Sequence, residues 1–373
     1  MTIPVRQIDD PRLSQGRWLR IPGPTVVHPA AVKAQTYDLF PHRGKQITPF
    51  MLELYAKARE AHRTEGQVLV WAGSGSAGWE AGITNLLSPG DKVVVTITGA
   101  FGERFAQVGK TFGLDVHRVE VEWGQAVTPE MFAESLDEAG DVRAVFITHN
   151  ETSTGVTNPL RELAALARAK GALILVDAVS SAAAMPLEVD EWELDWVFSG
   201  VQKAWMCPPG LMLAAVSERA MRASASNRMK RFYFDLAAMS DAARRGGTAT
   251  TGALSLLYAL DAALDAMLDE GMDAVWARHA RLGQCFRDGL TEMGVRVLAE
   301  PAFASSSVTA FHTPGGQSAE AFQERIDTCS GVAIATGQGP MATTVNRVGH
   351  MGWVNQPELE ATLEAIREAI QAE

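Results

Sequence analysis

The sequence predicts an α/β protein: a large domain with a mostly parallel sheet, followed by a smaller C-terminal α+β domain. Short, continuously apolar runs alternate with amphipathic helical stretches up to about residue 250, and long helices then precede short strand-like pieces. Such runs are typical of strands buried on both faces, and their alternation with helices indicates a parallel sheet with helices on both sides. At 373 residues, the chain is also long enough for two domains.

Seven apolar runs are predicted as strands of the large domain. They are Val68–Trp71, Lys92–Ile97, Val116–Val121, Ala144–Thr148, Leu173–Asp177, Trp196–Ser199 and Leu211–Val216. Helices are predicted between them, for example at Phe101–Thr111, Pro129–Ala139 and Pro159–Ala169. The last of these carries its apolar residues on one face, as a helix packed on a sheet requires.

The pattern changes in the C-terminal part. A long apolar helix, Leu254–Leu268, leads to Gly271, a residue type common at helix ends. The elements predicted after it are the helix Ala274–Met293, the short strands Val295–Leu298, Ser307–Phe311, Val332–Ile334 and Asn346–Gly349, and the helix Pro357–Ala372. We therefore expect an N-terminal arm at residues 1–21, a large domain at 22–270 and a small domain at 271–373.

The composition excludes several classes of protein. A net charge of −11 disfavours nucleic acid or an anionic membrane as partner, because both attract basic surfaces. Cys207, Cys285 and Cys329 are widely spaced, which fits neither a disulfide framework nor a zinc site, so no metal is expected. The polar N-terminus does not look like a signal peptide, and no apolar run reaches the roughly 18–20 residues of a membrane helix. These features favour a cytoplasmic protein.

A glycine-rich turn follows the first predicted strand. In Ala72-Gly73-Ser74-Gly75-Ser76, the backbone can turn tightly and present N–H groups at the start of the next helix. Free N–H groups and the hydroxyls of Ser74 and Ser76 suit an anion. Taken alone, the turn is equally well explained as a purely structural feature.

Two later residues stand where chemistry is expected. Asp177 ends the strand Leu173–Asp177, at the sheet edge where open α/β folds bind ligands, although a lone Asp there is also a common helix cap. Lys203 follows the strand Trp196–Ser199 among apolar residues, which lower the pKa of an amine and make it a better nucleophile. A surface lysine is the alternative reading of Lys203 alone. The order of anion loop, strand-ending Asp and strand-following Lys favours a cofactor site.

With these motifs, the sequence resembles the class V, fold-type-I aminotransferases that depend on pyridoxal 5′-phosphate (PLP), in particular the alanine–glyoxylate and serine–glyoxylate branch. The resemblance runs from Ile21-Pro22-Gly23-Pro24-Thr25 to Arg347-Val348-Gly349-His350-Met351-Gly352. Its most specific blocks are the Gly-Ser-Gly loop, residues 149–156 (HNETSTGV), residues 176–180 (VDAVS) and residues 199–203 (SGVQK).

The resemblance implies a role for each matching residue. Lys203 is expected to hold PLP as a Schiff base and then to act as the base, and Asp177 to pair with the pyridinium nitrogen. Phe101 is expected to stack on the ring, and Ser153 to contact the region of the 3′ oxygen. The remaining expected contacts are Ser74, Gly75, Ser76 and Gln202 with the phosphate, Thr251 with the phosphate of a neighbouring subunit, and Arg347 and Gly23 with the substrate.

The resemblance also implies the function: amino-group transfer from alanine or serine to glyoxylate or pyruvate by a ping-pong mechanism, in a homodimer with active sites at the interface. Two departures put the inter-subunit contact in doubt. Thr248 stands where some relatives carry a Tyr, and Gly252-Ala253 replaces a Pro-Pro pair. The alternatives are pyridoxamine–pyruvate or 2-aminoethylphosphonate–pyruvate transamination, cysteine desulfurase chemistry through Cys329, and a PLP-fold protein that only binds.

Overall fold

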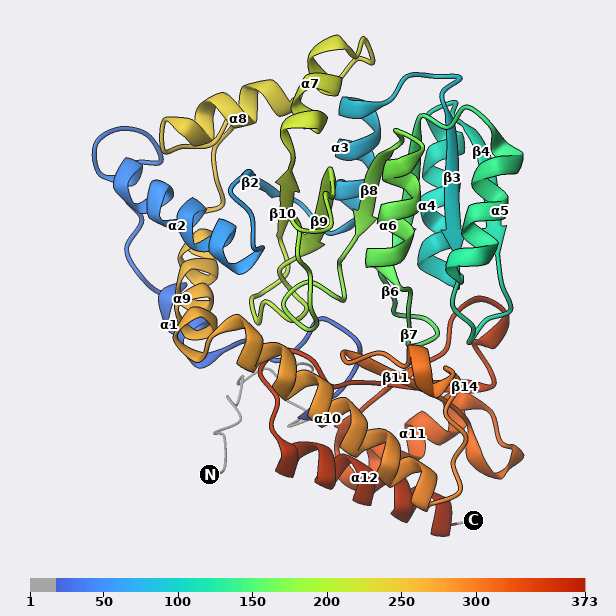
Figure 1. The fold of residues 1–373 in the computed structure, drawn as a ribbon. Coiled ribbons are helices and arrows are strands. Elements are labelled where there is room, and N and C mark those ends of the chain that lie inside the picture. Colours follow the sequence, from blue (N-terminus) through green and yellow to red (C-terminus); the bar gives the residue numbers. More distant parts are fainter. Residues whose placement is uncertain (1–17, 373) are drawn as a thin grey trace.

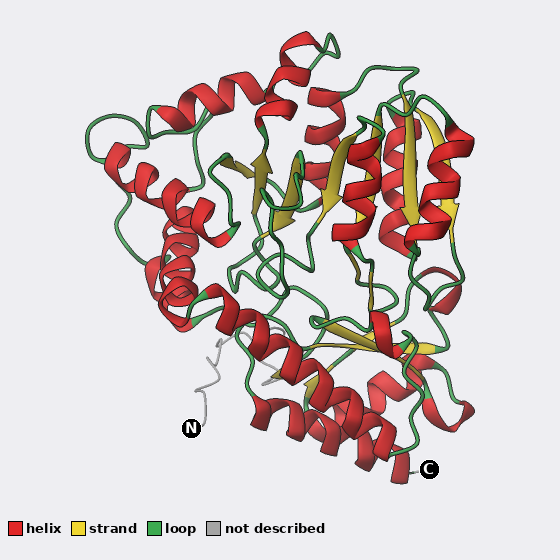
Figure 2. Ribbon diagram, in the orientation of Figure 1, coloured by secondary structure: helices red, strands yellow, loops and turns green. Residues whose placement is uncertain are grey.

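The computed structural model describes residues 18–372, and its centre is a seven-stranded sheet in the order β2-β10-β9-β8-β5-β3-β4. The strands are β2 (Gln67–Ala72), β3 (Lys92–Ile97), β4 (Asp115–Glu120), β5 (Ala144–Thr148), β8 (Leu173–Asp177), β9 (Trp196–Gly200) and β10 (Leu211–Val216). Only β10 is antiparallel to its neighbours, β2 and β9, and the other neighbouring pairs are parallel. The predicted α/β class with a mostly parallel sheet is confirmed (Figure 2).

Helices cover the sheet on both faces (Figure 1). One face carries α3 (Ser76–Leu86), α4 (Ala100–Thr111) and α7 (Glu218–Ser226), and the other carries α5 (Pro129–Ala139) and α6 (Leu160–Ala169). The chain runs outward through β3 and β4 and then returns through β5 and β8, so right-handed crossovers place α4 and α5 on opposite faces. Further helices at the β2 end are α1 (Pro29–Ala34), α2 (Ile47–Ala61), α8 (Leu236–Arg244) and α9 (Leu254–Glu270).

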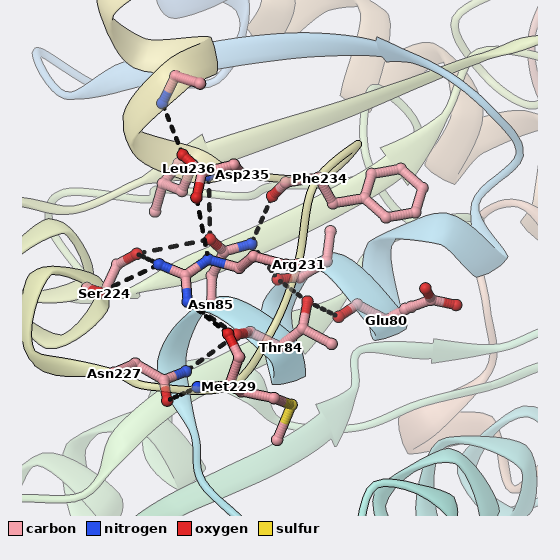
Figure 3. A network of polar contacts seen from close by, with 12 residues as sticks. Glu80, Thr84, Asn85, Ser224, Asn227, Met229, Arg231, Phe234, Asp235 and Leu236 are labelled. Atoms are coloured by element: carbon pink, nitrogen blue, oxygen red, sulfur yellow. Dashed lines mark hydrogen bonds and ion pairs between the residues drawn. The ribbon is translucent and has the colours of Figure 1, made fainter.

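Helix α3 is held at its C-terminal end by a polar network that joins it to the segment between α7 and α8 (Figure 3). The Asn85 side-chain amide donates to the carbonyl oxygen of Phe234 at 2.6 Å, and the Asn227 amide donates to that of Thr84 at 2.9 Å. Arg231 donates to the carbonyl oxygens of Thr84 and Met229 at 3.4 and 3.1 Å. These contacts fix the far end of α3, while its first turn follows Ser74 and Gly75.

The C-terminal part is a smaller layer below the carboxyl ends of the parallel strands (Figure 1). It contains the antiparallel sheet β11-β14-β13, the helices around it, and the pair β1-β12. Its elements are β11 (Val308–His312), β12 (Val332–Ala333), β13 (Ala335–Thr336), β14 (Val345–Gly349), α10 (Met272–Glu292), α11 (Ala319–Ser330) and α12 (Gln356–Gln371), with β1 (Trp18–Leu19) from the N-terminal segment.

Two apolar cores correspond to the two layers, and α10 contributes to both. Its first turns, with Val275 and Trp276, pack in the large core, and Leu282 and Phe286 pack in the second. Residues 1–17 of the expected N-terminal arm lie outside the described residues. The domain boundary near Gly271 remains a prediction.

One predicted strand, Val295–Leu298, is wrong. This segment runs beside β11 but forms only an isolated bridge, between Val297 and Phe311. Flanking backbone hydrogen bonds are present from Leu298 N to Ala310 O and from His312 N to Arg296 O, both 2.9 Å long. The contact with β11 is thus too short to form a ladder. Between residues 18 and 372, no helix combines the length and the apolar character needed to cross a membrane.

Candidate active site

A cavity of about 270 Å³ opens at the carboxyl edge of the main sheet. It brings together these predicted site residues: Gly23, Ser74, Gly75, Ser76, Phe101, Asp177, Gln202 and Lys203. A second cavity of about 280 Å³ contains Arg347 and shares Gly23, Phe101, Thr152 and Lys203 with the first. The two cavities therefore meet at Lys203.

Lys203 is 9% exposed, and its Nζ donates to the carbonyl oxygen of Pro22. A Cβ atom on Gly23 would lie 2.6 Å from Lys203 Cδ and 2.7 Å from Nζ, so a side chain there would displace the amine, and the φ of +124° at this position also favours glycine. Burial lowers the pKa of the Lys203 amine to about 8, and the nearby positive charge of Arg347 acts in the same direction. The neutral, nucleophilic fraction of the amine at pH 7 is therefore much larger than for an ordinary lysine.

Asp177 ends β8 and is 3% exposed. Trp79 Nε1 donates to its Oδ2 at 3.0 Å, and the Val179 backbone N–H donates to its Oδ1 at 2.9 Å. Burial raises the pKa of the Asp177 carboxyl to about 7, because no contacting cation offsets the cost of desolvation. The carboxylate is oriented by two donors and still lacks a cationic partner among the described residues.

The glycine-rich turn lies close to the end of β9. A Cβ on Gly75 would lie 2.5 Å from a methyl carbon of Val179, and one on Gly200 would lie 2.7 Å from the Gln202 Oε1. Helix α3 begins at Ser76 and has no side-chain cap. The Ala77 and Gly78 N–H groups donate to the carbonyl oxygens of Ser74 and Gly75 at 2.9 Å, whereas those of Gly75 and Ser76 have no acceptor among the described residues and can bind an anion. The buried Oε1 of Gln202 has no partner among the described residues either.

Arg347 reaches the second cavity from β14 and is 7% exposed. Its Nε donates to the Thr336 carbonyl at 2.9 Å, and its Nη1 donates to the Thr152 carbonyl at 3.2 Å. Burial lowers the pKa of this guanidinium to about 10, against the attraction of Glu151, so it is still charged at neutral pH. In the described part of the chain Nη2 has no partner, which leaves one edge of the fork for a carboxylate.

Ser153, which the resemblance places near the 3′ oxygen, has its hydroxyl engaged within the protein. It is fully buried, and its hydroxyl donates to Glu151 Oε1 at 2.6 Å and accepts from the Ala100 N–H at 2.9 Å. The neighbouring Thr152 lines both cavities instead. Ser153 lines neither cavity, and its contact with a cofactor stays a prediction.

The structure brings further residues to the cavity that the sequence did not single out. They are Trp79, Asn150, Thr152, Val179 and Ser180. Asn150, Thr152, Val179 and Ser180 lie inside the two motifs at residues 149–156 and 176–180, so the motifs contained the information. Trp79 lies outside these motifs, and only the fold shows that its ring nitrogen donates to Asp177.

Thr251 is exposed and does not line either cavity of its own chain. It lies with Thr248 and Thr250 around a small crevice between β2, β10 and the start of α9. Cys329 is exposed near the end of α11 and lines neither cavity.

The donor set fits a flat, charged cofactor. The cavity offers an unpaired buried carboxylate for a ring cation, free N–H groups and hydroxyls for an anionic arm, and a partly neutral amine for a carbonyl. Phe101 stands at both cavities as an aromatic surface. PLP has all three complementary groups: a pyridine nitrogen, a phosphate and an aldehyde.

Comparisons with known proteins agree with this geometry. Residues 31–354 match the family model described as aminotransferase class-V. The chain is 37% identical over 95% of its length to the soluble hydrogenase small subunit of Synechococcus sp. strain PCC 6716, covering 93% of that protein. It is 33% identical over 91% of its length to the serine–glyoxylate aminotransferase of Methylorubrum extorquens, covering 88% of it.

Among solved structures, pyridoxamine–pyruvate aminotransferase from Mesorhizobium loti superposes with a TM-score of 0.92 at 29% identity, over 95% of this chain and 92% of that one. The fold-type-I architecture that the sequence predicted is thereby confirmed. Both the family match and the relatives span nearly the whole described chain. The chain belongs to the class V aminotransferases, enzymes that move an amino group between an amino acid and a 2-oxo acid.

Proposed function

We propose that this enzyme uses PLP bound covalently to Lys203 and transfers the amino group of alanine or serine to glyoxylate or pyruvate in a homodimer. The observation that carries the proposal is the position of Lys203. A buried amine with a pKa of about 8 lies where a cavity with an unpaired carboxylate meets a cavity with an arginine. When bound, the cofactor supplies an electron sink that makes the substrate α-proton acidic.

Each residue then has one task. Asp177, oriented by Trp79 and Val179, holds the proton on the cofactor's ring nitrogen. The turn at Ser74–Ser76 and the Gln202 amide bind the phosphate, and Phe101 packs against the ring. These contacts keep the cofactor in one orientation beside Lys203.

Arg347 binds the substrate carboxylate through its free edge and thereby orients the α-carbon toward Lys203. With the cofactor bound, the Lys203 amine would be the base that takes the α-proton and returns it elsewhere. Its pKa of about 8 suits both directions of this transfer near neutral pH.

The single guanidinium of the second cavity supports monocarboxylate substrates. Besides Lys203, Arg347 is the one cationic side chain among the described residues that line it. The serine–glyoxylate relative supports the same substrate class, whereas the pyridoxamine–pyruvate neighbour makes pyridoxamine the necessary comparison substrate.

Replacing Lys203 tests the proposal. Lys203→Ala should retain part of its non-covalent PLP binding, because the phosphate and ring contacts remain, but should lose transamination. In the wild-type protein, borohydride should fix PLP on the peptide that contains Lys203. Wild-type turnover by Lys203→Ala, or fixation on another lysine, would refute the proposal.

A further inference from the structure

Three buried residues on one wall of the first cavity form a closed hydrogen-bond network. Asn150, Thr152 and Ser180 all line the cavity, and their side chains are 3%, 4% and 2% exposed. Thr152 Oγ1 lies 2.8 Å from Ser180 Oγ, which in turn lies 2.8 Å from Asn150 Nδ2 and 3.0 Å from the Asn150 carbonyl oxygen. Asn150 Nδ2 also donates to Ser307 Oγ at 3.1 Å, which ties this wall to the C-terminal layer.

The Asn150 carbonyl fixes the direction of the bonds. A carbonyl oxygen can only accept, so the single proton of the Ser180 hydroxyl must point to it. The two lone pairs of Ser180 Oγ then accept from Asn150 Nδ2 and from Thr152. The Asn150 amide orientation agrees with this, because its Oδ1 accepts from the Thr157 hydroxyl at 3.0 Å.

The Thr152 hydroxyl therefore acts as the donor in its bond to Ser180. Its only proton lies in the bond to Ser180, and only its lone pairs remain for the cavity. The backbone of Thr152 is held as well, since its carbonyl accepts from Arg347 Nη1. A ligand group that meets Thr152 thus meets a hydrogen-bond acceptor.

The chemistry of PLP indicates which ligand group this is. On the ring, the phosphate arm and the hydroxyl flank the aldehyde carbon on opposite sides. The cavity's remaining polar side chains fall into two sets: Ser74, Ser76 and Gln202 by the turn, and Asn150, Thr152 and Ser180 in the network. If the first set binds the phosphate, as proposed above, the second set faces the ring oxygen.

We propose that Ser180 is a positioning residue that holds the Thr152 hydroxyl as an acceptor, so that the ring oxygen of the cofactor receives no proton from this wall. This inference rests on the proposed function, because it requires PLP on Lys203. Its consequence is electronic: without a donor, the negative charge on the ring oxygen is not stabilised from this side. The Lys203–cofactor linkage therefore keeps its proton to a higher pH.

The test is the pKa of the cofactor's absorbance band in the holoenzyme, titrated in four proteins: wild type, Ser180→Ala, Thr152→Val and the double variant. Ser180→Ala frees the Thr152 proton to turn into the cavity, and a new hydrogen bond to a charged oxygen should lower the band's pKa by about one unit. Thr152→Val removes the hydroxyl and should leave the pKa near the wild-type value. In the Thr152→Val background, Ser180→Ala should then change nothing.

Ser181→Ala is the matched control, because the buried Ser181 hydroxyl has no partner in the described part of the chain. The ionisable groups around this wall are Glu151 on β6 (Asn150–Glu151), Asp177 on β8, Arg347 on β14 and Lys203 after β9, and all variants retain them. Melting temperature and PLP affinity, measured in parallel, report any general loss of structure.

The outcomes separate the two proposals. If no band forms on Lys203, the proposed function fails. If the band forms but Thr152→Val raises its pKa while Ser180→Ala does not lower it, Thr152 already donates and this inference is wrong. A Ser180→Ala shift that persists without the Thr152 hydroxyl would also overturn it, because Ser180 would then act by another route.

Discussion

At the residue scale, Lys203 and Asp177 are buried ionisable groups whose pKa values are moved toward neutrality from opposite sides. Burial lowers the Lys203 pKa to about 8 and raises the Asp177 pKa to about 7. In both cases the charged form is the one that burial disfavours. A cofactor with a ring cation and an aldehyde would offset this desolvation cost for both groups: the cation would pair with the Asp177 carboxylate, and the aldehyde would react with the Lys203 amine.

The Lys203 pKa predicts how the apo-protein captures PLP. Only the neutral amine attacks an aldehyde, so the rate of band formation should rise with pH, with a midpoint near 8, and level off above it. Stopped-flow absorbance after mixing apo-protein with PLP measures this rate, with Lys203→Ala as the blank. A midpoint near 10, as for an exposed lysine, would show that burial does not control this amine.

Arg347→Lys should weaken amino acid binding selectively. Lysine keeps the charge but cannot form the two-pronged contact, and the loss of a charge-assisted hydrogen bond of about 1.5–3 kcal/mol raises KM about ten- to a hundred-fold. Half-reaction kinetics with alanine and with a carboxylate-free amine should show the loss for alanine alone. Arg287→Lys, a half-buried arginine that donates to Ser305 outside both cavities, is the control. Equal losses with both amines would make Arg347 structural.

The motif at residues 149–156 shows how far the sequence alone can identify individual site residues. It identified a segment that lines the cavity, but the lining residue is Thr152, whereas the predicted Ser153 donates to Glu151. Both residues are small and hydroxyl-bearing, so composition cannot distinguish them. The two residues differ in their contacts: the Ser153 hydroxyl donates to Glu151, which keeps it out of the cavity lining.

At the scale of elements, α3 must lie close to the main sheet for its first turn to reach the cavity. Gly78 and Gly82 face β9: Cβ atoms there would lie 2.1 Å from a Phe198 ring carbon and 2.7 Å from the Trp196 ring nitrogen. The glycines therefore set the distance between α3 and β9, and with it the position of the turn at Ser74–Ser76.

Gly78→Ala should push α3 away from Phe198. Overpacking of this kind costs about 1–3 kcal/mol, and the displaced turn should also bind PLP less tightly. Urea denaturation of the apo-protein and PLP titration give the two quantities. Gly247→Ala is the control, because a Cβ there meets its nearest atom, Ala242 O, at 3.7 Å. Unchanged stability of Gly78→Ala would contradict the close packing of α3.

The main sheet was predictable from sequence, because strands buried on both faces are apolar without interruption: the parallel strands β3, β5 and β8 and the antiparallel β10 have the predicted bounds. Strands whose existence depends on the residues they pair with could not be predicted from the sequence. Val295–Leu298 is apolar enough for a strand, yet it meets β11 at one bridge only. Helices α2 and α11 also went unassigned, because their apolar faces become apparent only against their neighbours in the fold.

At the scale of the whole molecule, an apolar group is exposed beside the segment that carries Thr251. Leu52 on α2 is 45% exposed, and the segment that leads from α1 to α2 exposes Tyr37 (54%), Leu39 (68%) and Phe40 (37%). Helix α2 adjoins the segment with Thr251, because a Cβ on Gly246 would lie 3.1 Å from Leu52 and the Tyr55 hydroxyl donates to the Gly247 carbonyl. This surface supports the proposed homodimer with Thr251 at its interface.

Leu39→Asp should therefore weaken the dimer and, with it, PLP affinity, because the inter-subunit phosphate contact is lost. Sedimentation velocity across a concentration series measures the association. Met131→Asp is the control, since Met131 is 38% exposed on α5, away from this group. A wild-type monomer that is fully active at assay concentration would contradict the interface.

The most direct test of the central claim is a single-turnover cycle of the holoenzyme. Mixing it with serine or alanine, without acceptor, should abolish the absorbance band of the Lys203-bound cofactor and release one 2-oxo acid per site. Adding glyoxylate or pyruvate should restore the band and yield the matching amino acid. A band that amino acids leave unchanged, or that they discharge without any recovery on adding an oxo acid, would contradict a ping-pong aminotransferase.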